Sequence, residues 1–273
     1  MSTPPYSFDA QDADVILRSP LEQGSDKFRD FRVHKTILSI ASIFFNDMFS
    51  LPQPPQPAAT GVILPIVEVT ESADVFEVFL RLIYPVGPPA ITSLQLVDDL
   101  FQIADKYLAN SVQEKLKLLL TSSRSFLRDD PIWVYALACR ANFDEEAELA
   151  IPLTFKMDPV RDIHLTHLRM MTAEAYNRLL VAHAARRTRL ITAISQAKAP
   201  SYHPRGCSCG GWFYTRVENK IHLAIWERPF LDRERFDSCL PESAKCGLET
   251  CRVSEQAISK YFTNILEEIE KLG

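Results

Sequence analysis

The sequence has few glycines, and their positions exclude several classes of enzyme. Only eight occur in 273 residues. None falls in the GxGxxG pattern of dinucleotide-binding folds, the GxxxxGK[ST] pattern of P-loop NTPases or the GxSxG pattern of α/β-hydrolases. These classes need such loops to let the backbone approach a phosphate or to expose a nucleophile. We therefore assign no catalytic residue from the sequence.

Long apolar runs and a surplus of basic residues are also missing. No run approaches the roughly 20 apolar residues of a membrane helix, and the start, MSTPPYSFDAQDAD, has acids where a secretory signal has basic residues. The net charge is −5, whereas affinity for nucleic acid comes mainly from clustered Lys and Arg. We expect an intracellular protein, cytoplasmic or nuclear, with no membrane or nucleic-acid partner.

The first half predicts a mixed α/β unit. DADVILRS alternates apolar and polar residues as a half-buried strand does, and the segment ending in FRDFRV predicts a second strand after a turn at Gly24. Two short helices follow, with Ser42 as the N-cap of the second. VILPIVEVT predicts a strand with an edge or bulge at Pro65. Three further helices, the second ending at Asn110, give the order β-β-α-α-β-α-α-α.

The second half predicts helices almost throughout. Asp130 and Pro131 form an N-cap and first-turn pair, and Thr172 begins a long helix. Glycines and prolines predict an irregular loop over residues 200–215. The last helix, from Ser254, has apolar residues along one face, which we expect to be buried.

These patterns carry a resemblance to a known family. DADVIL, FRVHKTILSIASIFFNDMFS, VFEVFLRLIYP and LVDDLFQIADKYLA occur in the order and spacing of the BTB (POZ) domain. The resemblance implies an α/β (α+β) BTB/POZ fold in the N-terminal half and a mostly α-helical C-terminal region. The region from about 130 to 272 resembles the helical extension of BTB proteins that are numerous in mushroom-forming fungi.

The domain organisation that follows from this resemblance has four segments. They are a flexible arm at residues 1–11, a BTB/POZ domain at 12–123, a helical extension at 124–199, and a cysteine-containing loop with the C-terminal helices at 200–273.

The resemblance also implies a non-enzymatic protein-interaction module. Such a module self-associates, here as a possible homodimer, and acts as a scaffold or adaptor. The alternative is a substrate adaptor of a cullin-based ubiquitin ligase, with Met48, Phe49 and Leu51 near the cullin contact. Cullin-binding members carry an acid just after this point, whereas here no Glu appears before Glu68. This departure weakens the cullin alternative.

Asp14 and His34 match family positions at the first strand and at the junction between the second strand and the first helix. A catalytic role needs a nucleophile nearby, and the sequence suggests none. We expect a structural hydrogen bond between the two side chains.

The cysteines are the best candidates for a metal site. Five of the six lie near the end of the chain, and thiolates in two close pairs bind structural zinc. The tentative ligands are Cys207, Cys209, Cys246 and Cys251, with Cys239, His203 and His222 as substitutes. The other interpretation is buried thiols without metal. A remote alternative is a zinc-dependent enzyme that uses this cluster.

Two further polar motifs lie in the helical half. His164 and His167 lack the Glu of an HExxH zinc hydrolase, so we expect solvated or capping histidines. Arg186, Arg187 and Arg189 form a short basic patch, which is either a solvated helix face or a contact for an anionic partner.

Overall fold

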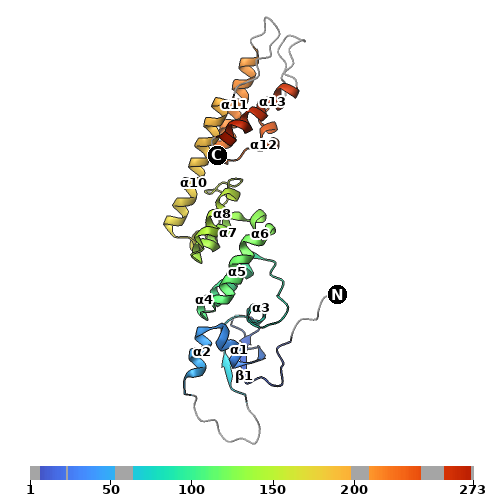
Figure 1. Cartoon of the computed structure of the whole chain (residues 1–273), viewed down its shortest axis with the longest axis vertical. Helices are drawn as coiled ribbons and strands as arrows, with labels where there is room; N and C mark the ends of the chain where they lie inside the picture. Colours follow the sequence, from blue (N-terminus) through green and yellow to red (C-terminus); the bar gives the residue numbers. More distant parts are fainter. Residues whose placement is uncertain (1–6, 23, 53–63, 198–208, 241–254, 272–273) are drawn as a thin grey trace, which may run out of the picture. The chain divides into compact units, whose positions relative to one another are not determined.

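The computed structural model describes residues 7–22, 24–52, 64–197, 209–240 and 255–271. The chain divides into two compact units, Met1–Glu146 and Ala147–Gly273, which are coloured blue to green and green to red in Figure 1. Among the described residues, no helix combines the length and the apolar composition needed to cross a bilayer.

Unit 1 is built around a small sheet. The strands are β1 (Val15–Pro20), β2 (Phe28–Val33) and β3 (Ile66–Glu68). They lie in the order β2-β1-β3, antiparallel between β1 and β2 and parallel between β1 and β3. Gly24 adopts a φ of +82° in the connection between β1 and β2. Pro65 comes just before the edge strand β3, so the prediction of an edge at this proline is confirmed.

Helices cover the sheet and continue beyond it. They are α1 (Lys35–Ala41), α2 (Ile43–Ser50), α3 (Ala73–Ile83), α4 (Leu94–Lys106), α5 (Asn110–Ser122), α6 (Arg124–Asp129), α7 (Pro131–Arg140) and α8 (Asp144–Thr154). The predicted order β-β-α-α-β-α-α-α is confirmed up to α5. The predicted end of the helix at Asn110 is wrong, because α4 ends at Lys106 and Asn110 begins α5.

The core of unit 1 lies where α3 and α4 pack with the sheet and α5. Phe76, Phe79 and Leu80 on α3 are fully buried, as expected from the apolar face of this helix. An ion pair between the buried Asp98 on α4 and the half-buried Arg140 on α7 joins two helices of the unit. Unit 1 extends to Glu146, while the predicted division of the chain into four segments stays a prediction.

Unit 2 is helical in its described residues. Besides the end of α8, it contains α9 (Leu165–Met170), α10 (Ala173–Gln196), α11 (Cys209–Glu227), α12 (Arg233–Ser238) and α13 (Glu255–Lys271). Its core is a cluster in which α10, α11, α12 and α13 all take part. Tyr261, Phe262 and Ile265 on α13 are buried there, which confirms the buried face predicted for the last helix. The irregular loop predicted over residues 200–215 is too long, because α11 begins at Cys209 and is helical through both following glycines.

His183 is a buried polar residue on α10. Its Nε2 lies 2.9 Å from the Thr154 hydroxyl, which itself donates to the Ile151 carbonyl at 2.6 Å. The hydroxyl therefore accepts a hydrogen bond from Nε2–H, and the ring is neutral with an unprotonated Nδ1. Nδ1 is buried without a hydrogen-bond partner among the described residues. Burial, together with the charge of Arg187, lowers the pKa of His183 to about 4.

The stability of unit 2 should therefore fall with acidification more steeply in the wild type than in His183→Gln. The unfolded chain binds a proton at His183 near its ordinary pKa of 6.5, whereas the folded chain does so only near 4. Stability is thus complete above pH 6.5 and is lost as the pH falls towards 4. The loss reaches at most about 3 kcal/mol at 1.36 kcal/mol per pKa unit.

Urea unfolding followed by circular dichroism at several pH values between 7 and 4 measures this difference. His164→Gln, which replaces an exposed histidine of the same unit, is the control. Equal pH dependence of wild type and His183→Gln would show that His183 does not resist protonation in the folded chain.

Candidate interaction surface

A single residue, Ser42, organises the helical hairpin of α1 and α2. Its backbone is extended and its N–H donates to Leu38, which ends α1. Its hydroxyl accepts from the Phe45 N–H at 3.1 Å, so the prediction of Ser42 as N-cap is confirmed. The same hydroxyl donates to the Tyr107 carbonyl at 2.5 Å. The hairpin is therefore fixed to the end of α4 at the point where α2 begins.

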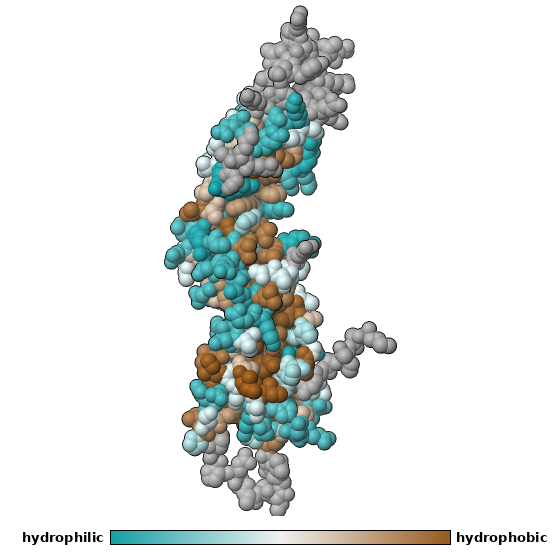
Figure 2. Space-filling view, viewed as in Figure 1, coloured by the Kyte–Doolittle hydropathy of each residue, from teal (hydrophilic) through white to brown (hydrophobic). Residues whose placement is uncertain are grey.

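Apolar side chains are exposed around this junction. Ile40 is 83% exposed, Ile43 51%, Phe44 41% and Leu108 49%; we call these four residues the α1–α2 patch. The Ile43 N–H donates to the Leu108 carbonyl at 3.4 Å, which makes the two residues neighbours. Figure 2 shows apolar side chains gathered in the lower part of the view, over elements of unit 1. Neighbouring exposed apolar side chains mark interaction sites more often than single ones do.

Leu108 reaches the patch through an unusual backbone conformation. Its φ is +50°, which is costly for a branched side chain and is normally taken by glycine. It occupies the position after α4 in a Schellman-type ending, where the N–H of Ala109 donates to Ala104 at 2.8 Å and its own N–H donates to Asp105 at 3.1 Å. Because the Leu108 side chain is half exposed, its packing contacts offset little of this conformational energy.

Tyr107 holds the chain in place next to Leu108. It is buried, and its ring stacks on Phe45 with the centroids 4.9 Å apart. Phe44 contacts the same ring edge-on at 5.4 Å. Burial and the neighbouring carboxylate of Glu71 raise the pKa of Tyr107, so the hydroxyl remains a hydrogen-bond donor. Tyr107 thereby connects the exposed Phe44 to the core.

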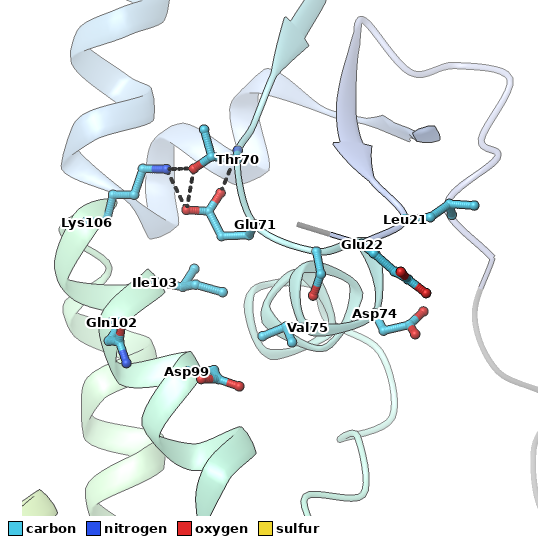
Figure 3. Close-up of a pocket in the computed structure, with 11 residues that line it drawn as sticks. Leu21, Glu22, Thr70, Glu71, Asp74, Val75, Asp99, Gln102, Ile103 and Lys106 are labelled. Atoms are coloured by element: carbon cyan, nitrogen blue, oxygen red, sulfur yellow. Dashed lines mark hydrogen bonds and ion pairs between the residues drawn. The ribbon is translucent and has the colours of Figure 1, made fainter. Parts of the chain in front are cut away.

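A pocket of about 700 Å³ lies beside this region. Figure 3 shows α4 on one side, with Gln102 and Lys106, and the start of α3 on the other, with Asp74. The charged residues of its lining are four acids and one lysine, namely Glu22, Glu71, Asp74, Asp99 and Lys106. Lys106 is paired with Glu71 and Asp74 with Arg29, so Glu22 and Asp99 carry the remaining acidic character of the lining.

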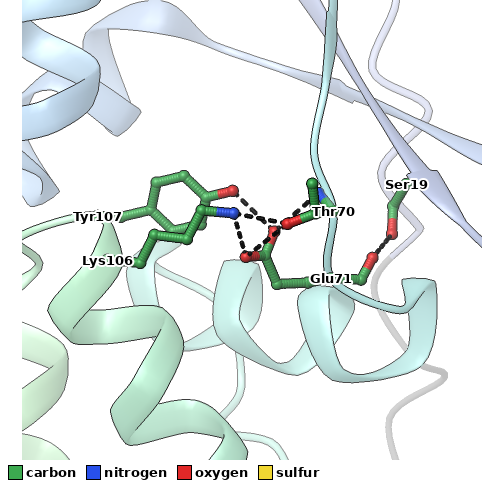
Figure 4. A network of polar contacts seen from close by, with 5 residues as sticks. All are labelled: Ser19, Thr70, Glu71, Lys106 and Tyr107. Carbon is green, nitrogen blue, oxygen red and sulfur yellow. Dashed lines mark hydrogen bonds and ion pairs between the residues drawn. The ribbon is translucent and has the colours of Figure 1, made fainter. Parts of the chain in front are cut away.

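Glu71 is the centre of the polar network in Figure 4. Its carboxylate accepts from the Tyr107 hydroxyl at 2.8 Å and from Lys106 at 2.5 Å, and its carbonyl accepts from the Ser19 hydroxyl at 2.6 Å. Burial on its own raises the pKa of Glu71, but the hydrogen bonds from Lys106 and Tyr107 outweigh it and hold the pKa below its ordinary value. The network joins β1, the start of α3 and the end of α4.

The comparison with family models now identifies this part of the chain. The model described as the BTB/POZ domain matches residues 13–124, which include the sheet and α1 to α5. Residues 13–124 form a BTB domain. This domain belongs to a protein-interaction family. A search of curated proteins gave no match to the chain.

The two residues expected to bond at the strand–helix junction of the BTB domain have other partners. Asp14 is exposed and accepts from the backbone N–H of Lys35 at 2.7 Å. The His34 ring lies 3.3 Å from the Tyr84 hydroxyl through Nδ1 and 3.3 Å from Asp12 through Nε2. The structure thus gives Asp14 and His34 separate partners in place of the expected bond between them. Asp14 accepts from Lys35 because the first N–H groups of a helix lack intrahelical acceptors.

The residues expected near a cullin lie at the end of α2 in the BTB domain. Leu51, just after the helix, is 64% exposed, while Met48 and Phe49 are half-buried. The Phe49 ring stacks on Phe45 with the centroids 6.0 Å apart. Their role as partner-binding residues stays a prediction.

Most of the predicted zinc ligands cannot be located among the residues that the structure describes. Cys207, Cys246 and Cys251 lie outside the described residues, as does His203, and Cys209 is described only as the first residue of α11. Cys239 is buried, and burial raises the pKa of its thiol. His164 and His167 cap the start of α9, in line with the capping role expected for them. The zinc site stays a prediction.

Three residues that form or support the α1–α2 patch were missed by the sequence analysis as functional candidates. Glu71 and Tyr107 are far apart in sequence, and although Tyr107 lies in the LVDDLFQIADKYLA segment, the pattern does not indicate its bond to Glu71. Leu108 had only a weak signal, because the segment between the two helices contains no glycine. A turn at that point therefore has to place a non-glycine residue at the left-handed position.

Strain at Leu108 can be measured by comparing two truncations. Leu108→Gly should be more stable than Leu108→Ala by about 1 kcal/mol, because both remove the side chain and only glycine adopts positive φ without a Cβ penalty. The midpoint of urea unfolding checks this difference. Equal midpoints would show that the backbone at Leu108 stores no strain.

Proposed function

We propose that the BTB domain self-associates through the α1–α2 patch and that the protein works as a non-enzymatic scaffold. The carrying observation is the exposure of Ile40 beside Ile43, Phe44 and Leu108. Fully burying a side chain such as isoleucine contributes about 1.5–3 kcal/mol. A second copy of the same patch supplies apolar area to cover it, as a two-fold interface requires.

The way the patch is supported favours a binding role. Ser42 and Tyr107 hold the backbone of the patch in place through their hydrogen bonds and ring contacts. Little conformational entropy is therefore lost when a partner packs on the patch. The helical region from about 130 to 272 then serves as an extension that binds partners or completes the scaffold. This assignment follows the resemblance to BTB proteins with a helical extension.

Self-association should weaken in the double variant Ile40→Lys, Ile43→Asp. Ile40 lies in the last turn of α1 and Ile43 is the first residue of α2, so the new charges suit the helix dipoles and the fold is retained. We expect the dimer dissociation constant to rise at least about tenfold, since charges replace apolar contacts. Sedimentation equilibrium of the full chain measures it.

The matched control is Phe28→Lys. It changes a half-exposed aromatic residue that is the first of β2, at the end of the strand away from α1. This variant should associate like the wild type. A monomeric wild type, or equal weakening by both changes, would contradict self-association through the patch.

A second candidate function is a cullin-ligase adaptor. The exposure of Leu51 next to Met48 and Phe49 favours it, because an apolar residue at the end of α2 is available to a partner. The missing acid argues against it, since Ser50, Leu51, Pro52 and Gln53 offer no carboxylate. In this version the BTB domain contacts the cullin and the helical region recruits the substrate.

A binding assay with the N-terminal region of the host's BTB-binding cullin separates the two functions. We expect the wild type to bind more weakly than about 1 μM, and Gln53→Glu, which creates an apolar-x-Glu pattern, to tighten binding. The gain should disappear when Met48→Asp and Leu51→Asp are added. Tight wild-type binding that these two changes abolish would establish the adaptor function instead.

A further inference from the structure

Unit 2 carries an exposed tryptophan that none of the functions above uses. Trp226 lies near the end of α11 and is 60% exposed, and Leu223, one turn earlier on the same helix, is 68% exposed. Residues three apart on a helix are neighbours on its surface. A tryptophan buries a large apolar area when a partner covers it, and tryptophans are enriched among the residues that dominate binding energy.

Arg187 of α10 lies against this tryptophan. Its guanidinium carbon is 4.9 Å from the centre of the indole ring, which is the distance of a cation–π contact. The Nε of Arg187 is buried and has no hydrogen-bond partner among the described residues. The guanidinium therefore holds the indole in position from one side and keeps an N–H donor that is not used. The site combines a positioned aromatic ring with hydrogen-bonding capacity at its edge.

This combination matches the chemistry of a proline-rich segment. The polyproline II conformation contains no internal hydrogen bonds, so its carbonyl oxygens are free to accept from a guanidinium. Proline rings supply flat apolar surface for an indole, and their fixed φ reduces the conformational entropy lost on binding. Aromatic surfaces of other recognition modules bind proline-rich segments in this way. A helix fits less well, because most of its carbonyls accept intrahelical hydrogen bonds.

The chain itself contains such a segment. Residues 52–57 have the sequence PQPPQP, with four prolines in six positions, and residues 50–61 contain no charged side chain. The segment lies between α2 and β3 in the sequence of unit 1, and residues 53–63 are outside the described residues. Without a carboxylate, the segment has to use its rings and backbone carbonyls for binding, which are the groups that Trp226 and Arg187 suit.

We propose that Trp226, Leu223 and Arg187 bind the segment at residues 52–57 of a second copy of the chain. The prolines pack on the exposed indole and on Leu223, and a carbonyl oxygen accepts from Arg187. The choice of a second copy rests on the self-association proposed above, because a dimer raises the effective concentration of the segment at the site. This contact uses different surfaces on the two copies, unlike a two-fold contact through the α1–α2 patch.

Fluorescence anisotropy with a labelled peptide of residues 50–60 tests the site directly. The receptor is a serine variant of the full chain, in which competition from its own segment is removed by Pro54→Ser, Pro55→Ser and Pro57→Ser. We expect Trp226→Ala in this receptor to weaken peptide binding at least about tenfold. Leu165→Ala, which truncates a 72% exposed residue of the same unit, should leave binding unchanged. A peptide with alanine at every proline should bind at least about tenfold more weakly.

A mixing experiment tests the second copy as the source of the segment. A labelled serine variant, which keeps the site, is mixed with a Trp226→Ala chain, which keeps the segment. Both chains also carry Ile40→Lys and Ile43→Asp, so that the α1–α2 patch does not hold them together. We expect association at the concentration at which the peptide saturates the site, and none when an unlabelled serine variant replaces the Trp226→Ala chain.

Two sets of results would overturn the proposal. Equal binding of the proline and alanine peptides, or unchanged binding by the Trp226→Ala receptor, would show that the tryptophan does not recognise the segment. Peptide binding without association of the two mixed chains would exclude a second copy as the source. The peptide assay does not depend on the α1–α2 patch, so a failure of self-association through the patch is distinguishable from a failure of this site.

Discussion

The Tyr107 hydroxyl donates its hydrogen bond to Glu71 inside unit 1, and the geometry of the α1–α2 patch depends on this contact. Glu71 comes just before α3, and Tyr107 comes just after α4. Their bond of 2.8 Å therefore fixes the end of one helix against the start of another. The Tyr107 carbonyl in turn accepts from Ser42, which begins α2. A buried polar contact thus determines where exposed apolar side chains lie.

Leu108 shows the consequence of fixing the backbone in this way. With Tyr107 and Ala109 both buried, the residue between them has to reverse the chain direction, and it does so at positive φ. Glycine satisfies the same geometry at lower conformational energy. Leucine instead adds exposed apolar area next to Ile43. The Schellman-type ending of α4 accounts for the positive φ of Leu108, and the exposed side chain adds to the apolar area of the α1–α2 patch.

The sequence predicted local structure better than it predicted the contacts of the surface. Ser42, Pro65 and Asp130 act locally, through a cap, a missing N–H and a first turn, so their effects were predictable from a few neighbouring residues. The sequence analysis placed the end of α4 too late. The apolar periodicity continues past Lys106, whereas the tertiary contacts of Tyr107 end the helix there. Asp14 and His34 were matched to the right junction, but His34 contacts Tyr84, which is distant in sequence, and Asp14 bonds to the Lys35 N–H.

The two units differ in the chemistry of the side chains that they leave at the surface. In unit 1 the charged groups around Glu71 satisfy one another, and the side chains left exposed at the patch are apolar. In unit 2 the neutral His183 satisfies Thr154 inside the unit, and the arginines that follow it on α10 face a groove with aromatic surface. Apolar contact and charge pairing respond in opposite directions to salt, since screening weakens only the second. Self-association through the α1–α2 patch, as proposed, should therefore be insensitive to the salt concentration that weakens charge pairing.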